Sequence, residues 1–119
     1  MKTLTTTLML VLLPILTIIA QDGAYAKAMV KAFAEMEKAK SPDAMLATAN
    51  TFERISEKAT EEYLPSYYAA LNLLNYSWTI QDPAERDNTI DRATELVKKA
   101  RETAPGNDEV EVLNGYALM

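Results

Sequence analysis

The sequence predicts an all-α protein built from antiparallel helical hairpins, and three observations support that class. Apolar residues recur at intervals of three and four along most of the chain, which is the period of an amphipathic helix. Prolines and capping residues divide this pattern into short segments. No stretch has the pattern of a strand. Together the helices form one domain, residues 21–119. The expected helices span about 24–40, 42–59, 64–81, 84–104 and 108–119.

Residues 1–20 have the pattern of a secretory signal peptide. Lys2 precedes an uncharged apolar run from Leu8 to Ala20 that ends on a small residue. A helix that spans a bilayer takes about 20 apolar residues, and Pro14 interrupts this run. We therefore expect cleavage after Ala20, with a cut after the Ala-x-Ala of residues 24–26 as the alternative. An uncleaved leader that anchors the protein in a membrane is less favoured.

Composition excludes several classes of function. Without residues 1–20 the chain keeps 11 basic and 17 acidic residues, a net charge of −6, which offers no electrostatic footprint for nucleic acid. The absence of cysteine means that an exported domain must rely on packing or on neighbours rather than on disulfides. The absence of histidine removes the commonest general base and metal ligand. We expect no catalytic residue, no metal site and no cofactor.

The first two expected helices form a hairpin. Ser41 is a good N-cap and Pro42 suits the first helical position, so a second helix starts directly after the first. One face of the first helix carries Tyr25, Met29, Phe33, Met36 and Ala39. The buried stripe of the second helix carries Met45, Ala49, Phe52, Ile55 and Ala59.

The third expected helix differs from the others because it has no charged residue between Leu64 and Ile80. A helix that is apolar nearly all round must be covered on more than one side, so we expect it at the centre. Asp82 caps the fourth helix, and Asp108 is the expected cap of the fifth. The fourth helix has a narrow stripe of Ile90, Ala93, Val97, Ala100 and Ala104, and the fifth has Val110, Leu113 and Ala117.

One segment resembles a known repeat family. Ala93, Val97, Ala100 and Pro105 follow one another at spacings of 4, 3 and 5, which is similar to the second helix of a tetratricopeptide repeat and the proline that ends it. Gly115, ten positions after Pro105, is small where that family has a small residue in the next first helix. The preceding unit fits the same frame through Phe52, Ile55, Thr60 and Ala70. The resemblance implies a right-handed solenoid of stacked hairpins, as in small exported repeat proteins of Gram-negative bacteria.

The same resemblance implies a groove for a peptide or partner segment, lined by the first helix of each pair. An Asn at the position of Asn75 often binds the backbone of the ligand in this family. For the aromatic cluster of Tyr63, Tyr67, Tyr68, Tyr76 and Trp78, the favoured interpretation is that it fills the core around the third helix, and the alternative is that some of its rings line the groove. Carried over to this sequence, the groove residues are Phe33, Glu37, Lys40, Tyr67, Leu71, Asn75, Val112 and Tyr116.

These features lead to a non-enzymatic module that binds a protein or peptide outside the cytoplasm. The periplasm is the favoured location, with secretion or attachment to the envelope as alternatives. A structural role is the second hypothesis, in which the protein oligomerises through an exposed last helix or stays anchored through its leader. A small hydrolase that uses a carboxylate pair is least favoured. The acidic pairs fit solvated faces and helix N-termini.

The final run "EVEVLNGYALM" predicts a helix whose apolar face nothing covers. A repeat protein normally ends in a helix with a polar outer face, because an uncovered apolar stripe favours association. We therefore expect either that the chain is a fragment of a longer repeat protein, which is the favoured interpretation, or that its last helix is a docking surface.

Overall fold

The computed structural model describes residues 23–119, which form five helices and no strand. The first of them, residues 23–38, is here named the N-terminal helix. It is followed by α2 (Pro42–Lys58), α3 (Leu64–Ser77), α4 (Pro83–Thr103) and α5 (Asp108–Ala117). The predicted all-α class is confirmed. None of the helices in this range is both long and apolar enough to cross a membrane. The predicted signal peptide, residues 1–20, lies outside the described residues.

Side-chain caps start α2 and α4 at the residues that the sequence predicts. The Ser41 hydroxyl accepts a hydrogen bond at 3.2 Å from the backbone N–H three residues later, and Pro42 is the first residue of α2. The Asp82 carboxylate accepts a hydrogen bond at 3.1 Å from the backbone N–H three residues later, and Pro83 is the first residue of α4. Both caps satisfy a donor that the first turn of a helix leaves without a partner.

The predicted cap of α5 is wrong by one residue. Asn107, not Asp108, accepts the hydrogen bond from the backbone N–H of Val110, at 3.2 Å, and Asp108 is the first helical residue. The chain turns at Gly106, whose φ of 76° is a conformation that glycine adopts without strain. This turn leaves Asn107 extended, with φ −72° and ψ 122°, which is the backbone that an N-cap needs.

The helices end earlier than the apolar pattern predicts. The N-terminal helix stops at residue 38 rather than 40, and α3 stops at Ser77 rather than 81. Ser41 must be extended to cap α2, with φ −117° and ψ 158°, so the chain leaves the helix before it. Lys40 consequently lies in the exposed turn between two helices, and its expected place on the groove-lining helix is wrong.

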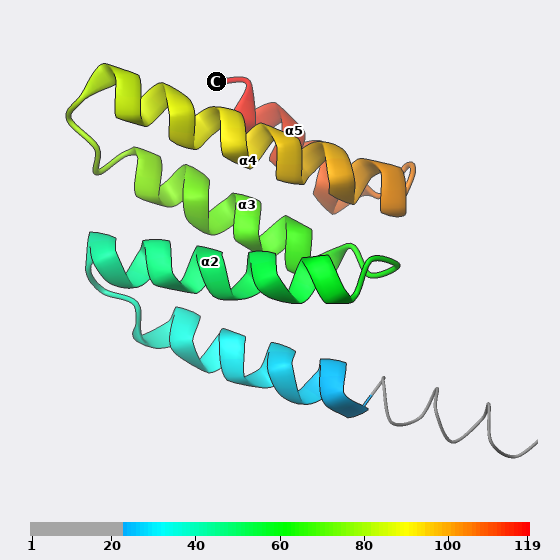
Figure 1. Cartoon of the computed structure of the whole chain (residues 1–119). Helices are drawn as coiled ribbons and strands as arrows, with labels where there is room; N and C mark the ends of the chain where they lie inside the picture. The colour runs from blue at the N-terminus through cyan, green and yellow to red at the C-terminus, as the bar shows by residue number, and fades with distance from the viewer. Residues whose placement is uncertain (1–22) are drawn as a thin grey trace, which may run out of the picture.

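Consecutive helices pack antiparallel in a layered arrangement, with the N-terminal helix and α4 on opposite sides of α2 and α3 (Figure 1). Alternate helices run in the same direction and touch. Phe33 of the N-terminal helix packs against Tyr68 of α3. Met36, three positions after Phe33, lies against Asn72, four positions after Tyr68, so the two helices run in the same direction. α5 packs against both α4 and α3. The central position predicted for α3 is confirmed, since it contacts helices on either side.

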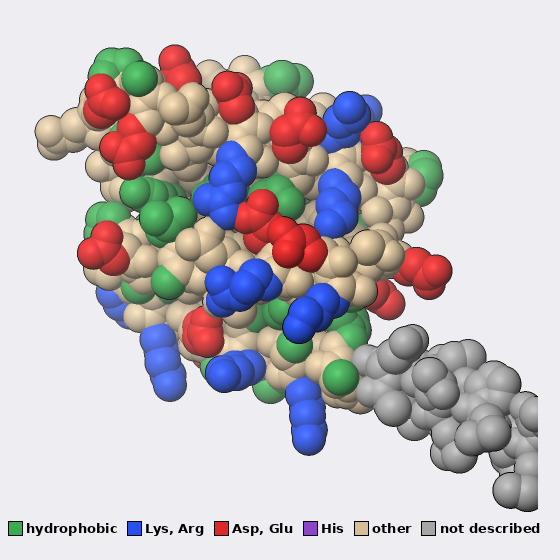
Figure 2. Space-filling view, in the orientation of Figure 1, with side chains coloured by type: hydrophobic (Ala, Val, Ile, Leu, Met, Phe, Trp, Pro, Cys, Tyr) green, Lys and Arg blue, Asp and Glu red, His purple; other side chains and the backbone are tan. Residues whose placement is uncertain are grey.

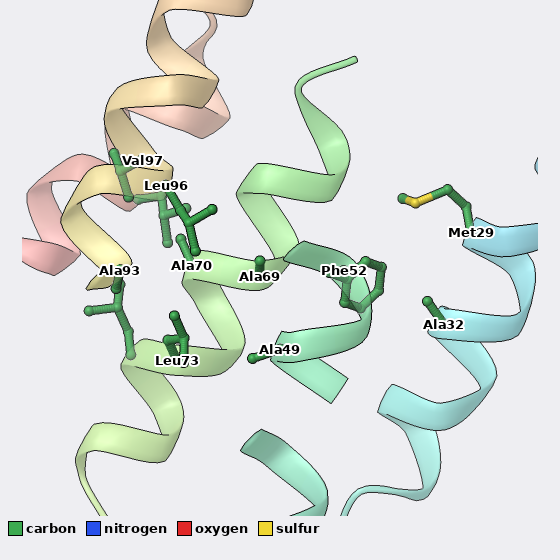
Figure 3. Packing of buried hydrophobic residues seen from close by; sticks show 12 residues of the cluster. Met29, Ala32, Ala49, Phe52, Ala69, Ala70, Leu73, Ala93, Leu96 and Val97 are labelled. Atoms are coloured by element: carbon green, nitrogen blue, oxygen red, sulfur yellow. The ribbon is translucent and has the colours of Figure 1, made fainter. Parts of the chain in front are cut away.

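The core is a narrow layer of small and medium side chains between these helices (Figure 3). Small side chains let helix axes approach closely, and larger ones fill the space around them. Phe52, which is fully buried, packs against Phe33 and Tyr68 with ring centroids 5.4 and 5.5 Å away. Six alanines have no exposed surface: Ala32, Ala49, Ala69, Ala70, Ala93 and Ala100.

Long polar side chains join α2 to α4 on the outside of this layer. Arg92 pairs with Glu53 and donates to Asn50 Oδ1 at 2.7 Å. About two turns further along α4, Lys99 Nζ donates to the backbone oxygen of Ser56 at 2.9 Å. The second helices of the two pairs are thereby linked by polar side chains.

Candidate partner-binding surface

The first helices of the pairs are the N-terminal helix, α3 and α5, and their side chains form the surface on which the predicted groove residues lie. Tyr67, Leu71 and Tyr116 are half-buried, whereas Asn75 and Val112 are exposed. Because α3 and α5 pack against each other, these residues belong to one continuous patch. We call it the α3–α5 surface: Tyr67, Leu71, Asn75, Trp78, Val112 and Tyr116.

A short hydrogen-bond chain joins the two helices of the α3–α5 surface. Trp78 Nε1 donates to Tyr116 Oη at 2.7 Å, and Tyr116 Oη donates to Asn75 Oδ1 at 3.2 Å. The phenol therefore fixes the orientation of the Asn75 amide, whose Nδ2 donates to no other residue in the part of the chain that the structure describes. This leaves an oriented amide donor beside two aromatic rings at the surface.

Trp78 is a member of this surface that the groove prediction missed, and its interpretation as a core residue is wrong. Its side chain is 69% exposed. α3 ends at Ser77, so Trp78 occupies the C-cap position and projects beyond the packed part of the helix. The polar break that begins at Gln81, directly after this segment, is the sequence signal that could have placed it at a helix end.

Tyr67 marks the other end of the surface. The pKa of Tyr67 is raised above its ordinary value of 10.0, and burial is the largest cause. The nearby carboxylate of Glu109 and the phenols of Tyr68 and Tyr63 raise it further. Its ring meets the Tyr68 ring edge to face, with centroids 5.0 Å apart. Tyr67 thus stays a neutral hydrogen-bonding group near the start of α5, while Asn75 lies near its end.

The N-terminal helix contributes less to this surface than the sequence predicts. Phe33 is half-buried, and its ring packs edge to face on Tyr68 at 4.8 Å, so it belongs to the interface between helices. Glu37 is exposed, and Lys40 lies beyond the helix end. The structure therefore joins the predicted residues Asn75 of α3 and Tyr116 of α5 by a hydrogen bond, whereas Phe33 packs on Tyr68 and Lys40 lies in the turn before α2.

A hollow of about 960 Å³ lies between the N-terminal helix and α2. Charged and polar side chains form its rim, and Thr51 Oγ1 links its two sides by donating to Glu35 Oε2 at 3.2 Å. The Tyr25 hydroxyl is buried beside it without a hydrogen-bond partner among the described residues. Burial, then Glu62 and Tyr63, raise the pKa of Tyr25.

The α3–α5 surface offers aromatic rings, aliphatic side chains and an amide, which suit recognition rather than covalent chemistry. Within residues 23–119, no three acidic side chains lie close enough together to hold a metal ion. Comparison of the chain with protein-family models, with curated proteins and with solved structures gave no match.

Proposed function

We propose that the protein is an exported, non-enzymatic interaction module that binds a peptide segment of another protein along the α3–α5 surface. The observation that carries this proposal is the chain of hydrogen bonds from Trp78 through Tyr116 to Asn75. It holds an amide donor in a fixed orientation between α3 and α5, and no acceptor within residues 23–119 uses that donor.

A bound peptide matches this arrangement chemically. Its backbone carbonyls need donors once water is displaced, and the Asn75 amide nitrogen supplies one. Leu71 and Tyr67 offer apolar contact one and two turns earlier on α3, respectively, and aromatic residues are enriched at such interfaces. Because the amide and the rings are already ordered by contacts within the protein, little side-chain entropy is lost on binding.

We also propose that the helices form a tetratricopeptide-like right-handed solenoid. Support comes from the parallel course of alternate helices and from the fully buried Ala93 and Ala100 on α4, at the positions where that repeat has small residues. Support for export comes from Lys2 and the apolar run of residues 8–20. The periplasm is the proposed location, and a protein or peptide is the proposed partner, with no role for nucleic acid or a cofactor.

A site-specific crosslinking experiment tests the proposal. A photoreactive amino acid is placed at Leu71 in cells that export the protein, and crosslinked products are identified by mass spectrometry. The matched control carries the same group at Thr94, which is exposed on α4 away from the surface. We expect a discrete product from position 71 that Asn75→Ala combined with Tyr67→Ala removes. If positions 71 and 94 capture the same proteins, or if the double substitution leaves the product in place, the proposed groove is wrong.

A further inference from the structure

The two end helices of the described fold each carry an outward face that no other described helix covers. On the N-terminal helix this face is opposite the buried Met29 and Ala32, and Val30 at its centre is 69% exposed. We call it the leading face: Ala26, Lys27, Val30, Ala34, Glu37 and Lys38, all of which are exposed. Its apolar centre is made of small side chains that would let another helix approach closely.

The outward face of α5 lies opposite the buried Val110 and Leu113. Three large apolar side chains are exposed there, with Val112 at 74%, Leu118 at 76% and Met119 at 93%. Gly115 lies at its centre, and a Cβ added to this glycine would meet nothing within 4 Å. We call it the trailing face: Asp108, Glu111, Val112, Gly115, Leu118 and Met119. The small size of Gly115 serves no contact among the described residues.

The side chains of these two faces carry net charges of opposite sign, and Glu111 of the trailing face is in addition paired with Arg101 of α4 at 3.0 Å. α5 carries three acidic residues in its first turn and no lysine or arginine. The leading face carries Lys27 and Lys38, with Lys31 at its edge, against Glu37 alone. In Figure 2, Lys and Arg side chains gather over the N-terminal helix and α2 at the bottom of the view, and acidic side chains are spread over α4 at the top. Opposite charges at the margins of two apolar stripes favour one pairing over the others.

We propose that the protein self-associates head to tail, with the leading face of one copy docked on the trailing face of a second copy. The apolar centres of the two faces would be buried together, while a lysine at one end of the leading face meets the carboxylate of Asp108 in the first turn of α5. In the alternative of two trailing faces in a symmetric pair, α5 offers no lysine or arginine to meet the carboxylates of the other copy, so that pairing gains no contact between opposite charges. The donor Asn75 and the residues Tyr67 and Leu71 lie outside both faces, and Val112 is the one residue that the trailing face shares with the α3–α5 surface.

A head-to-tail contact has two consequences that a symmetric contact lacks. Each copy keeps one free face of each kind, so association continues beyond a dimer as concentration rises. One helix face on another is a small interface, so the association is weak and is weakened further by salt, which screens the charges at its margins. Sedimentation velocity between about 10 and about 500 μM is a suitable range for an interaction of this strength.

Two variants block one face each without touching the core. Gly115→Arg places a bulky cation on the trailing face, where open space surrounds the glycine. Ala34→Glu places a bulky anion on the leading face, at an exposed position. Both are compared with the wild-type chain, purified in the form that the expressing cell delivers. Circular dichroism checks that the helices are retained.

We expect wild-type chains to form dimers and larger species in low salt, and each variant alone to remain monomeric at concentrations where wild type associates. A mixture of the two variants regains association, because an intact leading face on one meets an intact trailing face on the other. A wild-type chain that is monomeric throughout overturns the proposal. So does association that Gly115→Arg abolishes but Ala34→Glu leaves unchanged, since that result indicates pairing of two trailing faces, and so does a mixture that stays monomeric.

Discussion

Lys99 of α4 donates from Nζ to the backbone oxygen of Ser56 in the last turn of α2, at 2.9 Å, and to the Ser56 hydroxyl at 3.2 Å. The last four carbonyls of a helix have no partner within it, and the C-terminal end of the helix carries partial negative charge. A cation from another hairpin therefore satisfies an acceptor of α2 and holds the two hairpins together. The contact joins residues 43 positions apart.

The first prediction concerns this lysine. Lys99→Met keeps most of the aliphatic side chain but removes the charged donor, and we expect the free energy of unfolding to fall by about 1 kcal/mol, because hydrogen bonds to charged groups contribute modestly at partly exposed sites. Urea denaturation measures the change. Lys98→Met, at an exposed neighbouring position, is the matched control and should change stability by less than about 0.5 kcal/mol. Equal losses for both variants would contradict a role for the Ser56 contact.

Phe52 should be the costliest single truncation among the aromatic residues. Its side chain is fully buried and contacts Phe33 and Tyr68, so Phe52→Ala removes both the buried area and the ring contacts. Substitutions of this kind destabilise by about 3–5 kcal/mol, which is a large share of the stability of a small domain. Thermal unfolding should show a much lower Tm or no cooperative transition. Val30→Ala, measured in dilute solution, is the exposed control and should leave Tm nearly unchanged.

The cap of α5 can be distinguished by a pair of alanine substitutions. Asn107→Ala removes the side chain that accepts from the Val110 N–H, and we expect a loss of about 1 kcal/mol. Asp108→Ala removes only a favourable interaction with the helix dipole, which is worth roughly 0.3–1 kcal/mol at an exposed site. Chemical denaturation of both variants gives the order. A larger loss at Asp108 than at Asn107 would support the cap expected from the sequence.

The raised pKa values of Tyr25 and Tyr67 predict a loss of stability at alkaline pH. An unfolded chain releases these protons near the ordinary value of 10.0, before the folded chain does. Above that pH the folded state binds more protons than the unfolded state, so the free energy of unfolding decreases as pH rises. Urea denaturation at pH 9 and at about pH 11 should show this decrease. It should be smaller in Tyr25→Phe combined with Tyr67→Phe, and an identical decrease in that variant would refute the assignment to these two phenols.

Trp78 is the only tryptophan of the chain, and its fluorescence therefore reports on the α3–α5 surface alone. Tyr116→Phe removes the acceptor of its indole N–H and the donor to Asn75. We expect a changed emission spectrum and easier quenching by iodide, with a stability loss below about 1 kcal/mol because the site is exposed. Tyr76→Phe, on the same helix, is the control. An unchanged Trp78 spectrum in Tyr116→Phe would mean that the hydrogen-bond chain is absent in solution.

Helical periodicity predicted the buried faces well, because one face of each helix meets its neighbours. Ala49, Phe52, Ala93 and Val97 were expected in the core and are buried there. Thr48 and Ser56 were not expected, since polar residues are usually exposed, but each hydroxyl donates to a backbone carbonyl of its own helix and can be buried without cost.

The candidate site was predicted less completely. The repeat frame selected Asn75 and Tyr116, which the structure joins by a hydrogen bond. It also selected Lys40, which the early end of the N-terminal helix places in a turn, and it passed over Trp78. Helix ends depend on single capping residues and on the start of the next helix, so a frame based on spacing alone is least reliable there.

The sequence by itself determined the helical class, the positions of the breaks, two of the three caps and the central place of the uncharged helix. These properties depend on local preferences and on the period of apolar residues, which can be read along the chain. Only the tertiary structure decided which long side chains bridge helices that are about 40 residues apart in the sequence, as Lys99 does to Ser56. It also decided that Tyr116 orients the amide of Asn75. It also showed that Gly115 faces open space. Contacts between residues of different helices follow from the way the helices stack. The stacking depends on how helix faces cross in three dimensions, and the spacing of residues within one helix does not determine it.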